Sequence, residues 1–350
     1  MSHDASKFRN VLVLAATTAA AALTLTACGS DTPSDGASAG SSGGASGDVK
    51  VAAVIKGLDN PFFQAMEQGI QETADESGVE VSIQAAADIG DTTGQADKLS
   101  ALAGQDFGCF VVNPISGTNL VQALAPIAAA GTPVVNIDSP IDADAAAAAN
   151  LDPATYIGTD NGAAGGKAGD FVLENVDAGA QVAIIGGIAG DVTSGARVDG
   201  FKEAVGDQVE IIGEQAADWK REVALTKATD IIAANPDVKA FFAANDDMGL
   251  GIVKAVENAG KTGEIVVVSV DGNSDALQSV LDGGLSATVA QYPYAIGSLG
   301  LQACQIAAGG TELPETVESP TALVDADNAQ QALDAFPQPF EDFENPLEDL

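Results

Sequence analysis

The sequence predicts an α/β protein made of two similar lobes, each built on a parallel sheet. Short apolar runs alternate with amphipathic stretches of helical period along residues 49–325. This alternation is typical of parallel strands that are joined by crossover helices. The apolar runs are too many for one sheet of ordinary size, and the β-α pattern repeats in the two halves of the chain. We therefore expect two sheets.

The strand candidates are short and mostly apolar. They are Val49–Ile55, Val79–Gln84, Phe110–Val112, Pro133–Ile137, Gln181–Ile185, Val209–Gly213, Ala240–Ala243, Ile265–Val270 and Ala287–Ala290. The helix candidates between and after them are Phe62–Ser77, Thr93–Ala103, Thr118–Ala130, Gly162–Asn175, Ser194–Val205, Lys220–Ala234, Met248–Ala259, Ser274–Leu281 and Tyr294–Ala308. Residues 142–153 carry weak signals, Val317–Val324 is extended, and residues 336–350 are predicted to be a loose acidic tail.

Composition excludes several classes of function. The chain has 14 Lys and Arg against 50 Asp and Glu, a formal net charge of −36. The basic residues are too few against the acidic ones to form a surface that neutralises phosphates, so a general nucleic-acid surface is excluded. Such acidity keeps a protein soluble and monomeric, and we expect a monomer. The one histidine is His3, which removes most histidine-based catalysis and zinc ligation.

The N-terminus carries an export signal. Lys7 and Arg9 precede an apolar run, Val11–Thr26, that is too short for a comfortable membrane span. The run ends in Leu25-Thr26-Ala27-Cys28, which resembles the bacterial lipobox. That resemblance implies cleavage after a signal peptide of residues 1–27 and lipidation of Cys28; the alternative is a plain signal peptide with an incidental cysteine. Residues 28–48 are then a flexible Gly/Ser-rich tether, and the folded part is lipid-anchored to the cell membrane on its outer side.

Polar and aromatic side chains stand where the predicted strands end. Because ligands bind at the carboxyl ends of parallel strands, these side chains are candidate ligand contacts. Taken singly, each Asn or Asp could only cap a helix or form a turn, and each Phe could only belong to the core. Their occurrence at nearly every strand end favours a binding site. The candidates are Asn60, Phe62, Phe63, Asn113, Asp138, Ser139, Arg197, Trp219, Asn245, Asp271 and Gln291.

The chemistry of this set suits a small polyol. Carboxylates accept hydrogen bonds, amides both donate and accept, and a guanidinium donates in a fork, so these planar groups can bind adjacent hydroxyls. Aromatic faces such as those of Phe62, Phe63 and Trp219 can cover the C–H faces of a sugar ring. A ligand held between two lobes also couples binding to hinge closure.

Several strings in the chain belong to a known family. They are Asn60-Pro61-Phe62-Phe63, Asn113-Pro114, Gly187-Ile188-Ala189-Gly190, Arg197 with Gly200-Phe201, Phe242-Ala243-Ala244-Asn245-Asp246, Asp271-Gly272 and Ala290-Gln291. With them the chain resembles the sugar-binding proteins of ABC importers, in the ribose-binding branch of the type I periplasmic-binding fold. The resemblance implies two Rossmann-like lobes with parallel sheets joined by a three-strand hinge, sugar contacts at the candidate positions, a membrane-embedded ABC permease as partner, and no catalytic residue, cofactor or metal.

The same resemblance implies the topology. The chain crosses between lobes near residues 159–161, 291–292 and 319–321, which gives a first lobe of 49–158 plus 292–319 and a second lobe of 159–291 plus 320–335, followed by the acidic tail 336–350. The helix Tyr294–Ala308 then places Cys304 in the same lobe as Cys109. An exported protein can form disulfides, but whether these two cysteines are bridged or are two buried free thiols stays open.

One position departs from the family pattern. The ribose binders carry an arginine after the aspartate that matches Asp138, and this chain has Ser139 instead. Trp219 is also larger than the phenylalanine common at its position. A ribose-like pentose is the favoured ligand, and a hexose, a cyclitol or a linear polyol is the alternative.

Two other functional classes fit the sequence less well. An enzyme is disfavoured because Gly186–Gly190 lacks the spacing of a dinucleotide loop, and because Asp246-Asp247 at a helix start suits the helix dipole better than a metal. A receptor that passes a furanosyl signal to a membrane sensor remains an alternative to import. Transcription repressors of similar lobes need a DNA-binding headpiece, and an export signal stands in its place here.

Overall fold

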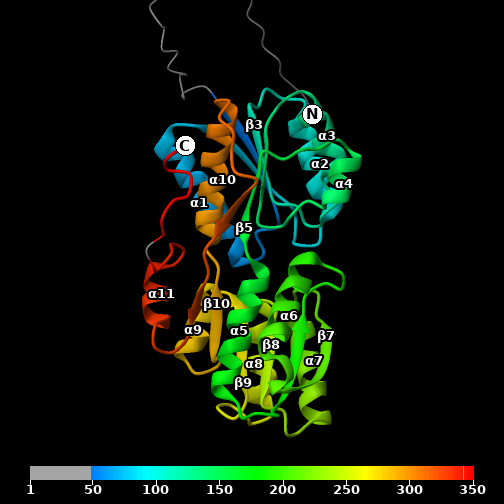
Figure 1. Ribbon diagram of the computed structural model, residues 1–350, viewed down its shortest axis with the longest axis vertical. Coiled ribbons are helices and arrows are strands. Elements are labelled where there is room, and N and C mark those ends of the chain that lie inside the picture. Colours follow the sequence, from blue (N-terminus) through cyan, green and yellow to red (C-terminus); the bar gives the residue numbers. More distant parts are fainter. Residues whose placement is uncertain (1–48, 342) are drawn as a thin grey trace, which may run out of the picture. The chain divides into compact units, whose positions relative to one another are not determined.

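The computed structural model describes residues 49–350 except residue 342, and it contains two six-stranded sheets (Figure 1). The predicted signal peptide of residues 1–27, the predicted lipidation site Cys28 and the predicted tether of residues 28–48 lie outside the described residues. Among the residues that are described, no helix is both long and apolar enough to cross a membrane.

The two sheets repeat one strand order. In the first sheet the order is β2-β1-β3-β4-β5-β11, with β1 Lys50–Ile55, β2 Glu80–Ala85, β3 Cys109–Val112, β4 Val134–Ile137, β5 Thr155–Thr159 and β11 Thr316–Ser319. In the second sheet the order is β7-β6-β8-β9-β10-β12, with β6 Gln181–Gly186, β7 Glu210–Ala216, β8 Ala240–Ala243, β9 Val266–Asp271, β10 Ala287–Ala290 and β12 Ala322–Val324. Among the strand pairs of the described residues, the β10–β12 pair alone is antiparallel. Both orders are doubly wound, and the predicted two-lobed α/β fold class is confirmed.

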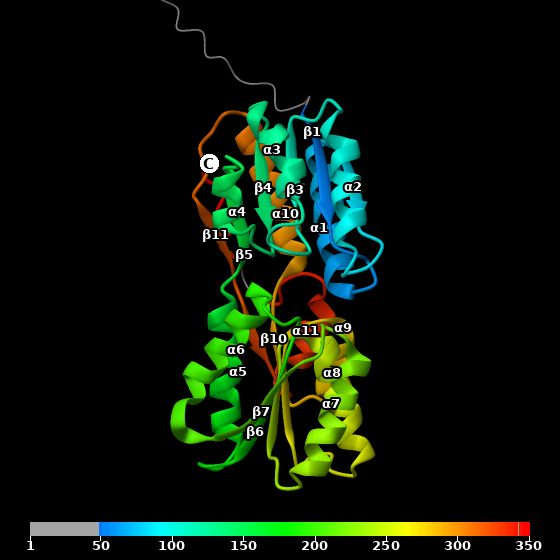
Figure 2. The same cartoon turned by 90° about the vertical axis from the view of Figure 1, so that its right-hand side faces the viewer.

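Helices cover both faces of each sheet (Figure 2). Those of the first lobe are α1 Pro61–Ser77, α2 Thr92–Ala103, α3 Val121–Ala129, α4 Ala143–Ala148 and α10 Pro293–Ala308. Those of the second lobe are α5 Asn161–Asn175, α6 Val192–Val205, α7 Arg221–Ala234, α8 Asp246–Asn258 and α9 Ser274–Leu281, while α11 Ala329–Ala335 follows the last strand. A short 3-10 turn, Gly206–Gln208, follows α6.

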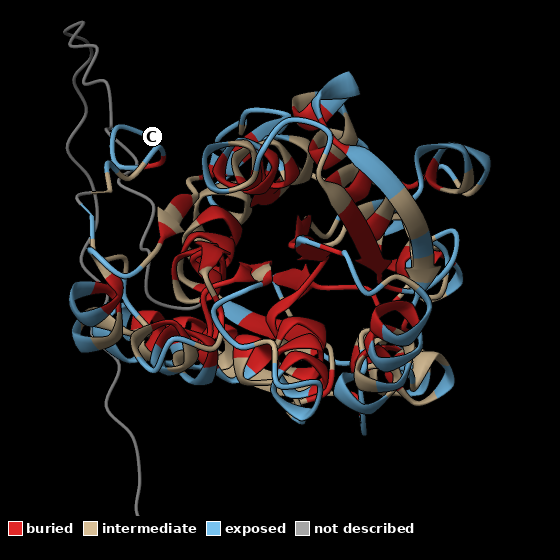
Figure 3. Cartoon of the chain, turned by 90° about the horizontal axis from the view of Figure 1, so that it is seen from below, coloured by how far each residue is buried: buried red, intermediate tan, exposed pale blue. Residues whose placement is uncertain are grey.

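Strand β1 shows why the sheets are buried on both faces. Successive side chains of a strand point to opposite faces. Val51, Ala53 and Ile55 pack with α1 and α10 residues in one core cluster, whereas Ala52 and Val54 pack with residues of α2 and α3 in another. All five side chains are fully buried, and Figure 3 shows buried residues gathered on the strands and on the inward sides of the helices. An all-apolar strand therefore fits a sheet that is covered twice.

The chain passes between the two sheets three times. The passages lie between β5 and α5, between β10 and α10, and between β11 and β12. Thr159 and Ser319 are register partners on the adjacent strands β5 and β11, so two of the passages leave the first sheet side by side. We call these passages, residues 159–161, 291–292 and 319–321, the hinge.

Two stretches differ from the sequence interpretation. Residues 142–153 hold the short helix α4, and strand β5 follows, although no strand was assigned there. Its sequence, Thr-Tyr-Ile-Gly-Thr, contains one aliphatic residue and a glycine, so the apolar signal is weak. The C-terminal tail is not loose, because Leu347 is buried among first-lobe core residues and Phe343 packs against them.

Cys109 on β3 and Cys304 on α10 form a disulfide, with Cα atoms 5.6 Å apart. Of the two alternatives that the sequence left open, the structure has the bridged one. The bond ties a central strand to the helix that returns to the first lobe after the second passage, and it closes a loop with a sequence separation of 195.

Candidate functional site

A cavity lies at the carboxyl ends of the strands of both sheets. Ten of the eleven candidate ligand contacts line it, and the exception is Asn113. The lining also includes residues that the sequence interpretation did not select, namely Lys56, Ile89, Ile115, Ile188, Asp191 and Thr193. Among the described residues, no group of three or more His, Cys, Asp or Glu side chains is placed to hold a metal ion.

The β1–α1 corner brings one amide and two aromatic rings to the cavity. Asn60 is the N-cap of α1, and its Oδ1 accepts a hydrogen bond of 2.9 Å from the backbone nitrogen of Phe62. Pro61 occupies the first helical turn, where its missing N–H costs nothing. The rings of Phe62 and Phe63 meet edge to face, 5.2 Å apart. The cap uses only Oδ1, so the Asn60 amide can start the helix and still donate to a ligand.

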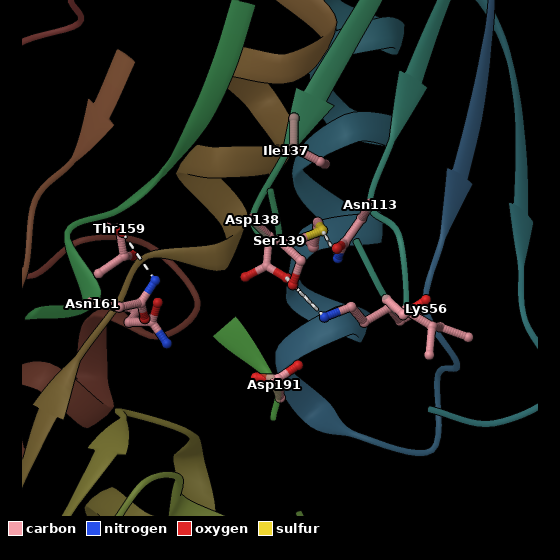
Figure 4. Close-up of polar contacts among 12 residues, drawn as sticks. Lys56, Asn113, Ile137, Asp138, Ser139, Thr159, Asn161 and Asp191 are labelled. Carbon is pink, nitrogen blue, oxygen red and sulfur yellow. Dashed lines mark hydrogen bonds and ion pairs between the residues drawn. The ribbon is translucent and has the colours of Figure 1, made fainter. Parts of the chain in front are cut away.

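Lys56 brings a positive charge to the position where the family arginine is missing. Its Nζ donates a hydrogen bond of 2.6 Å to Oγ of Ser139 and lies 3.4 Å from Oδ2 of Asp138 (Figure 4). It also lies 5.3 Å from the ring centroid of Phe63. The Lys56 and Asp138 side chains are only 15% and 10% exposed. Lys56 directly follows β1, and the rule that polar side chains at strand ends face the ligand would have found it.

Arg197 and Asp271 form the polar centre of the second-lobe wall. Nη1 of Arg197 donates to Oδ1 of Asp271 at 3.2 Å and to the carbonyl oxygen of Ala244 at 2.7 Å, while its Nε donates to Oδ1 of Asn161 at 2.8 Å. The side chains of Arg197 and Asp271 are 5% and 6% exposed. Gln291 Nε2 donates to the same Oδ1 of Asp271 at 2.8 Å. The second carboxylate oxygen of Asp271, Oδ2, therefore remains available to a ligand.

Burial sets the acidity of two neighbouring carboxyls. It raises the pKa of Asp271 to about 6, even though the Arg197 charge and the Gln291 hydrogen bond act to lower it. Burial, reinforced by the charge of Asp271, raises the pKa of Asp246 to about 8. Asp246 accepts hydrogen bonds from Ser269, Thr288 and the backbone of Asn273, and it does not line the cavity. Its role is to join α8 to β9 and β10 behind Asn245.

Three lining residues have strained backbones. Asp138, Trp219 and Asp271 have φ values of 60°, 62° and 141°, a region that non-glycine residues rarely adopt. Such conformations cost on the order of 1–3 kcal/mol each and are retained where the surrounding structure fixes them, often at ligand sites. Asp218, next to Trp219, is a further case with φ 53°. The strain is concentrated at the cavity.

Trp219 is seated by a glycine and an arginine. A Cβ atom on Gly187 would come within 2.3 Å of the indole, so only glycine allows the ring to lie against the end of β6. The Arg197 guanidinium carbon lies 5.9 Å from the centroid of the Trp219 ring. Trp219 and the Phe62–Phe63 pair thus bring aromatic surface to the cavity from different lobes.

Asn113 and Asn245 have different positions. Asn245 lines the cavity and is also the N-cap of α8, where its Oδ1 accepts from the backbone nitrogen of Met248 at 3.0 Å. Asn113 is fully buried at the end of β3, and its Nδ2 points to the sulfur of Met66 at 3.4 Å (Figure 4). Its Oδ1 has no hydrogen-bond partner among the described residues. The structure does not place Asn113 with the other ten candidates.

Comparisons with known proteins agree with this geometry. A family model described as a periplasmic binding protein domain matches residues 51–312. The D-allose-binding periplasmic protein of Escherichia coli is 39% identical over 254 residues, which cover 72% of this chain and 82% of that protein. The ribose import binding protein RbsB of Bacillus subtilis is 32% identical over 269 residues, covering 77% and 85%.

A solved structure gives the same result. An ABC transporter periplasmic solute-binding protein from Actinobacillus succinogenes with bound D-allose superposes with a TM-score of 0.77 and 29% identity, covering 81% of this chain and 99% of that one. The resemblance that the strings indicated is confirmed, and the enzyme alternative is set aside because the family consists of solute-binding proteins. From its sequence match, its two doubly wound lobes and its shared cavity, we conclude that this chain belongs to the periplasmic binding protein family.

Proposed function

We propose that the chain works on the outer side of the cytoplasmic membrane. There it captures a monosaccharide in the cavity between the two sheets and delivers it to an ABC permease in the membrane. The observation that carries this proposal is the arrangement at Asp271. One carboxylate oxygen is held by Arg197 and Gln291, which leaves the other oriented as an acceptor in a buried wall. A hydroxyl donor that is desolvated there gains a charge-assisted hydrogen bond, whereas an analogue that lacks the hydroxyl leaves this carboxylate oxygen without a hydrogen-bond donor.

The aromatic side chains support a ring-shaped ligand. Phe62 and Phe63 come from one lobe and Trp219 from the other, while the polar residues come from several strand ends. A pyranose has C–H bonds on its faces and hydroxyls on its edges, so it matches aromatic surfaces above and below a polar belt. A linear polyol has no such faces, which makes it a weaker candidate.

A ribose-like pentose is the first candidate, and D-allose is the second. The relatives named above are described as binding ribose or D-allose. In the pyranose form D-allose is D-ribose with an added hydroxymethyl group, so both present the same ring hydroxyls. Ser139 is shorter than the arginine of the ribose binders, and the Lys56 ammonium stands beside it as a donor. That difference favours D-allose as the alternative to a pentose.

Isothermal titration calorimetry tests the proposal directly. Residues 48–350 are titrated with D-ribose and D-allose, and with D-glucose and myo-inositol as matched polyols of different stereochemistry. We expect micromolar or tighter binding of at least one monosaccharide, about −8 kcal/mol or better. No binding across pentoses, hexoses and cyclitols would overturn the proposal, and binding of myo-inositol alone would replace it with a cyclitol receptor.

The cellular part of the proposal concerns the anchor and the partner. Lipidation at Cys28 would hold the protein at the membrane surface, and the tether of residues 28–48 would let it reach a permease. Cys28→Ser should release the protein from the membrane fraction, and unchanged fractionation would contradict lipidation. Loss of sugar uptake in a strain that lacks the protein supports import, whereas intact uptake with a lost response to the sugar supports the sensor alternative.

A further inference from the structure

The chain continues past its last strand with a segment that contacts both lobes. Figure 1 shows this segment in red, rising from α11 beside the second lobe to the C-terminus beside α1 and α10. We call residues 336–350 the strap, of which the structure describes 336–341 and 343–350. The family model ends at residue 312, so the strap follows the part of the chain that it matches.

The first part of the strap is fastened to the second lobe. Phe336 and Phe340 pack against the core cluster that contains Ala329 and Ala332 of α11 together with residues of α7, α8 and α9. Two hydrogen bonds accompany this packing. The backbone nitrogen of Gln338 donates to the carbonyl oxygen of Ala335, and Gln331 Nε2 donates to the carbonyl oxygen of Phe340 at 3.2 Å.

The middle of the strap lies on the hinge. Phe340 and Phe343 pack against a small buried cluster of Tyr292, Ala295 and Ala322. Tyr292 belongs to the second passage between the sheets, and Ala322 follows the third. Burial and the charge of Glu341 raise the pKa of Tyr292 to about 12. The strap therefore covers the segments about which the lobes would rotate.

The last part of the strap is fastened to the first lobe. Phe343 and Leu347 join the core cluster of β1, α1 and α10, and Leu347 is only 3% exposed. Asn345 Nδ2 donates to Oε1 of Gln302 on α10 at 2.8 Å. Asn345 Oδ1 accepts from the backbone nitrogen of Leu347 at 2.9 Å, which fixes the turn before the buried leucine.

These contacts make the strap a fourth connection between the lobes, and unlike the hinge it is non-covalent at its first-lobe end. Rotation of one lobe changes the position of α10 relative to α11, so the contacts at both ends can be complete in only a narrow range of lobe arrangements. In the arrangement of this structure the contacts are complete, and residues of both lobes line one cavity. We propose that the strap is a built-in clamp that favours the closed, ligand-binding arrangement and must detach from the first lobe before the cavity opens fully.

The consequence for affinity follows from population shift. Apparent affinity scales with the fraction of protein in the binding-competent arrangement, so a clamp that raises that fraction tightens binding without touching the ligand. This part of the inference rests on the proposed function. The effect on lobe opening does not, and it can be measured without any sugar.

Three variants of the chain from residue 29 onward test the clamp. Truncation after Ala335 removes the strap, and Leu347→Ala loosens only its first-lobe end. Leu350→Ala is the matched control, because Leu350 is a leucine of the same segment with 52% of its surface exposed. Small-angle X-ray scattering in the absence of sugar reports lobe opening, and circular dichroism verifies that each variant is folded.

We expect a larger radius of gyration for the truncated protein and for Leu347→Ala than for the parent and Leu350→Ala. With saturating sugar all four should converge, and the dissociation constant should rise about threefold to tenfold in the first two variants. An unchanged radius of gyration in the folded truncated protein would overturn the clamp. If the parent binds no sugar while the truncated protein and Leu347→Ala show the expected larger radius of gyration, the clamp stands and the proposed function fails.

Discussion

Lys56 donates a hydrogen bond of 2.6 Å to Ser139, joining the end of β1 to the turn after β4. The two residues are 83 positions apart in the sequence. They meet because only one strand, β3, separates β1 from β4 in the sheet. Ser139 stands where the ribose binders have an arginine, so the contact returns a positive charge to that side of the cavity from a different strand. Beside Asp138, the ammonium also balances a carboxylate that is nearly buried.

Lys56→Met should weaken monosaccharide binding. The substitution keeps most of the side-chain length but removes the donor and leaves Asp138 without its ion pair. Hydrogen bonds to charged groups contribute about 1.5–3 kcal/mol, so calorimetry should show a dissociation constant about tenfold to 150-fold higher. Lys50→Met, at the exposed start of the same strand, is the control and should bind normally. Equal affinity in both variants would show that Lys56 does not contact the sugar.

Site features that depend on neighbouring residues could be predicted from the sequence, whereas contacts between residues far apart in the chain could not. Asn60 and Pro61 are neighbours in the sequence and predict a helix start, and the structure has Asn60 as the N-cap of α1. Lys56 follows the first strand and fits the strand-end rule, but its contact with Ser139 depends on a later β-α unit and is not visible in the local sequence. Asn113 fits the strand-end pattern, but in the fold it turns toward Met66 rather than joining the other candidates in the cavity lining.

The fold shows the same division. Strands such as β6 are recognisable in the sequence because a strand that is buried on both faces is almost entirely apolar. Strand β5 was missed because tertiary pairing with β4 and β11, rather than its own apolar content, holds it in the sheet. The sequence predicts a loose strap because Phe343 and Leu347 are isolated among acidic residues. Their role becomes visible only in the fold, where both pack against the core of the first lobe.

Sugar affinity should decrease as the pH falls below about 6. Hydroxyl donors need the ionised form of Asp271, whose pKa burial raises to about 6. Above that pH the carboxylate is charged and affinity should be constant; below it, protonation competes with the ligand. Calorimetry between pH 4.5 and pH 8 measures the profile. Constant affinity over this range would mean that the ligand does not bind the Asp271 carboxylate.

Stability should have the opposite dependence on pH through Asp246. Its pKa is about 8 in the folded chain, whereas an unfolded aspartate has a pKa near 3.9. Between these values the folded state holds more protons than the unfolded state, so the free energy of unfolding decreases as the pH rises through this window and levels off above pH 8. Asp246→Asn should flatten the decrease in melting temperature between pH 6 and pH 8. Parallel profiles for the parent and the variant would contradict the shift.

Reduction of the Cys109–Cys304 disulfide should lower stability. A bond that closes a long loop restricts the unfolded chain and typically contributes about 2–4 kcal/mol. A Cys109→Ala, Cys304→Ala double variant should unfold at lower denaturant concentration under oxidising conditions. Adding a reductant should then affect only the parent. Neither cysteine lines the cavity, so sugar affinity at low temperature should be retained. A reductant effect of equal size in the double variant would show that the bond is not the cause.

Ionic strength should control how firmly the strap is attached. Residues 336–350 contain five acidic and no basic side chains, and the whole chain has a formal net charge of −36. Among the described residues, no ion pair involves the strap, so its apolar contacts form against electrostatic repulsion. Salt screens that repulsion, with a Debye length of about 10 Å at 0.1 M and about 30 Å at 0.01 M.

The parent should therefore bind sugar more tightly and scatter as a more compact particle in high salt than in low salt. Repulsion between the two acidic lobes also weakens with salt, so the truncated protein supplies the baseline. A Glu341→Gln, Glu344→Gln variant should show an intermediate salt dependence, because it keeps the apolar contacts and loses two charges. Identical salt dependence in the parent and the truncated protein would mean that the strap carries none of the effect, and that repulsion between the lobes alone accounts for it.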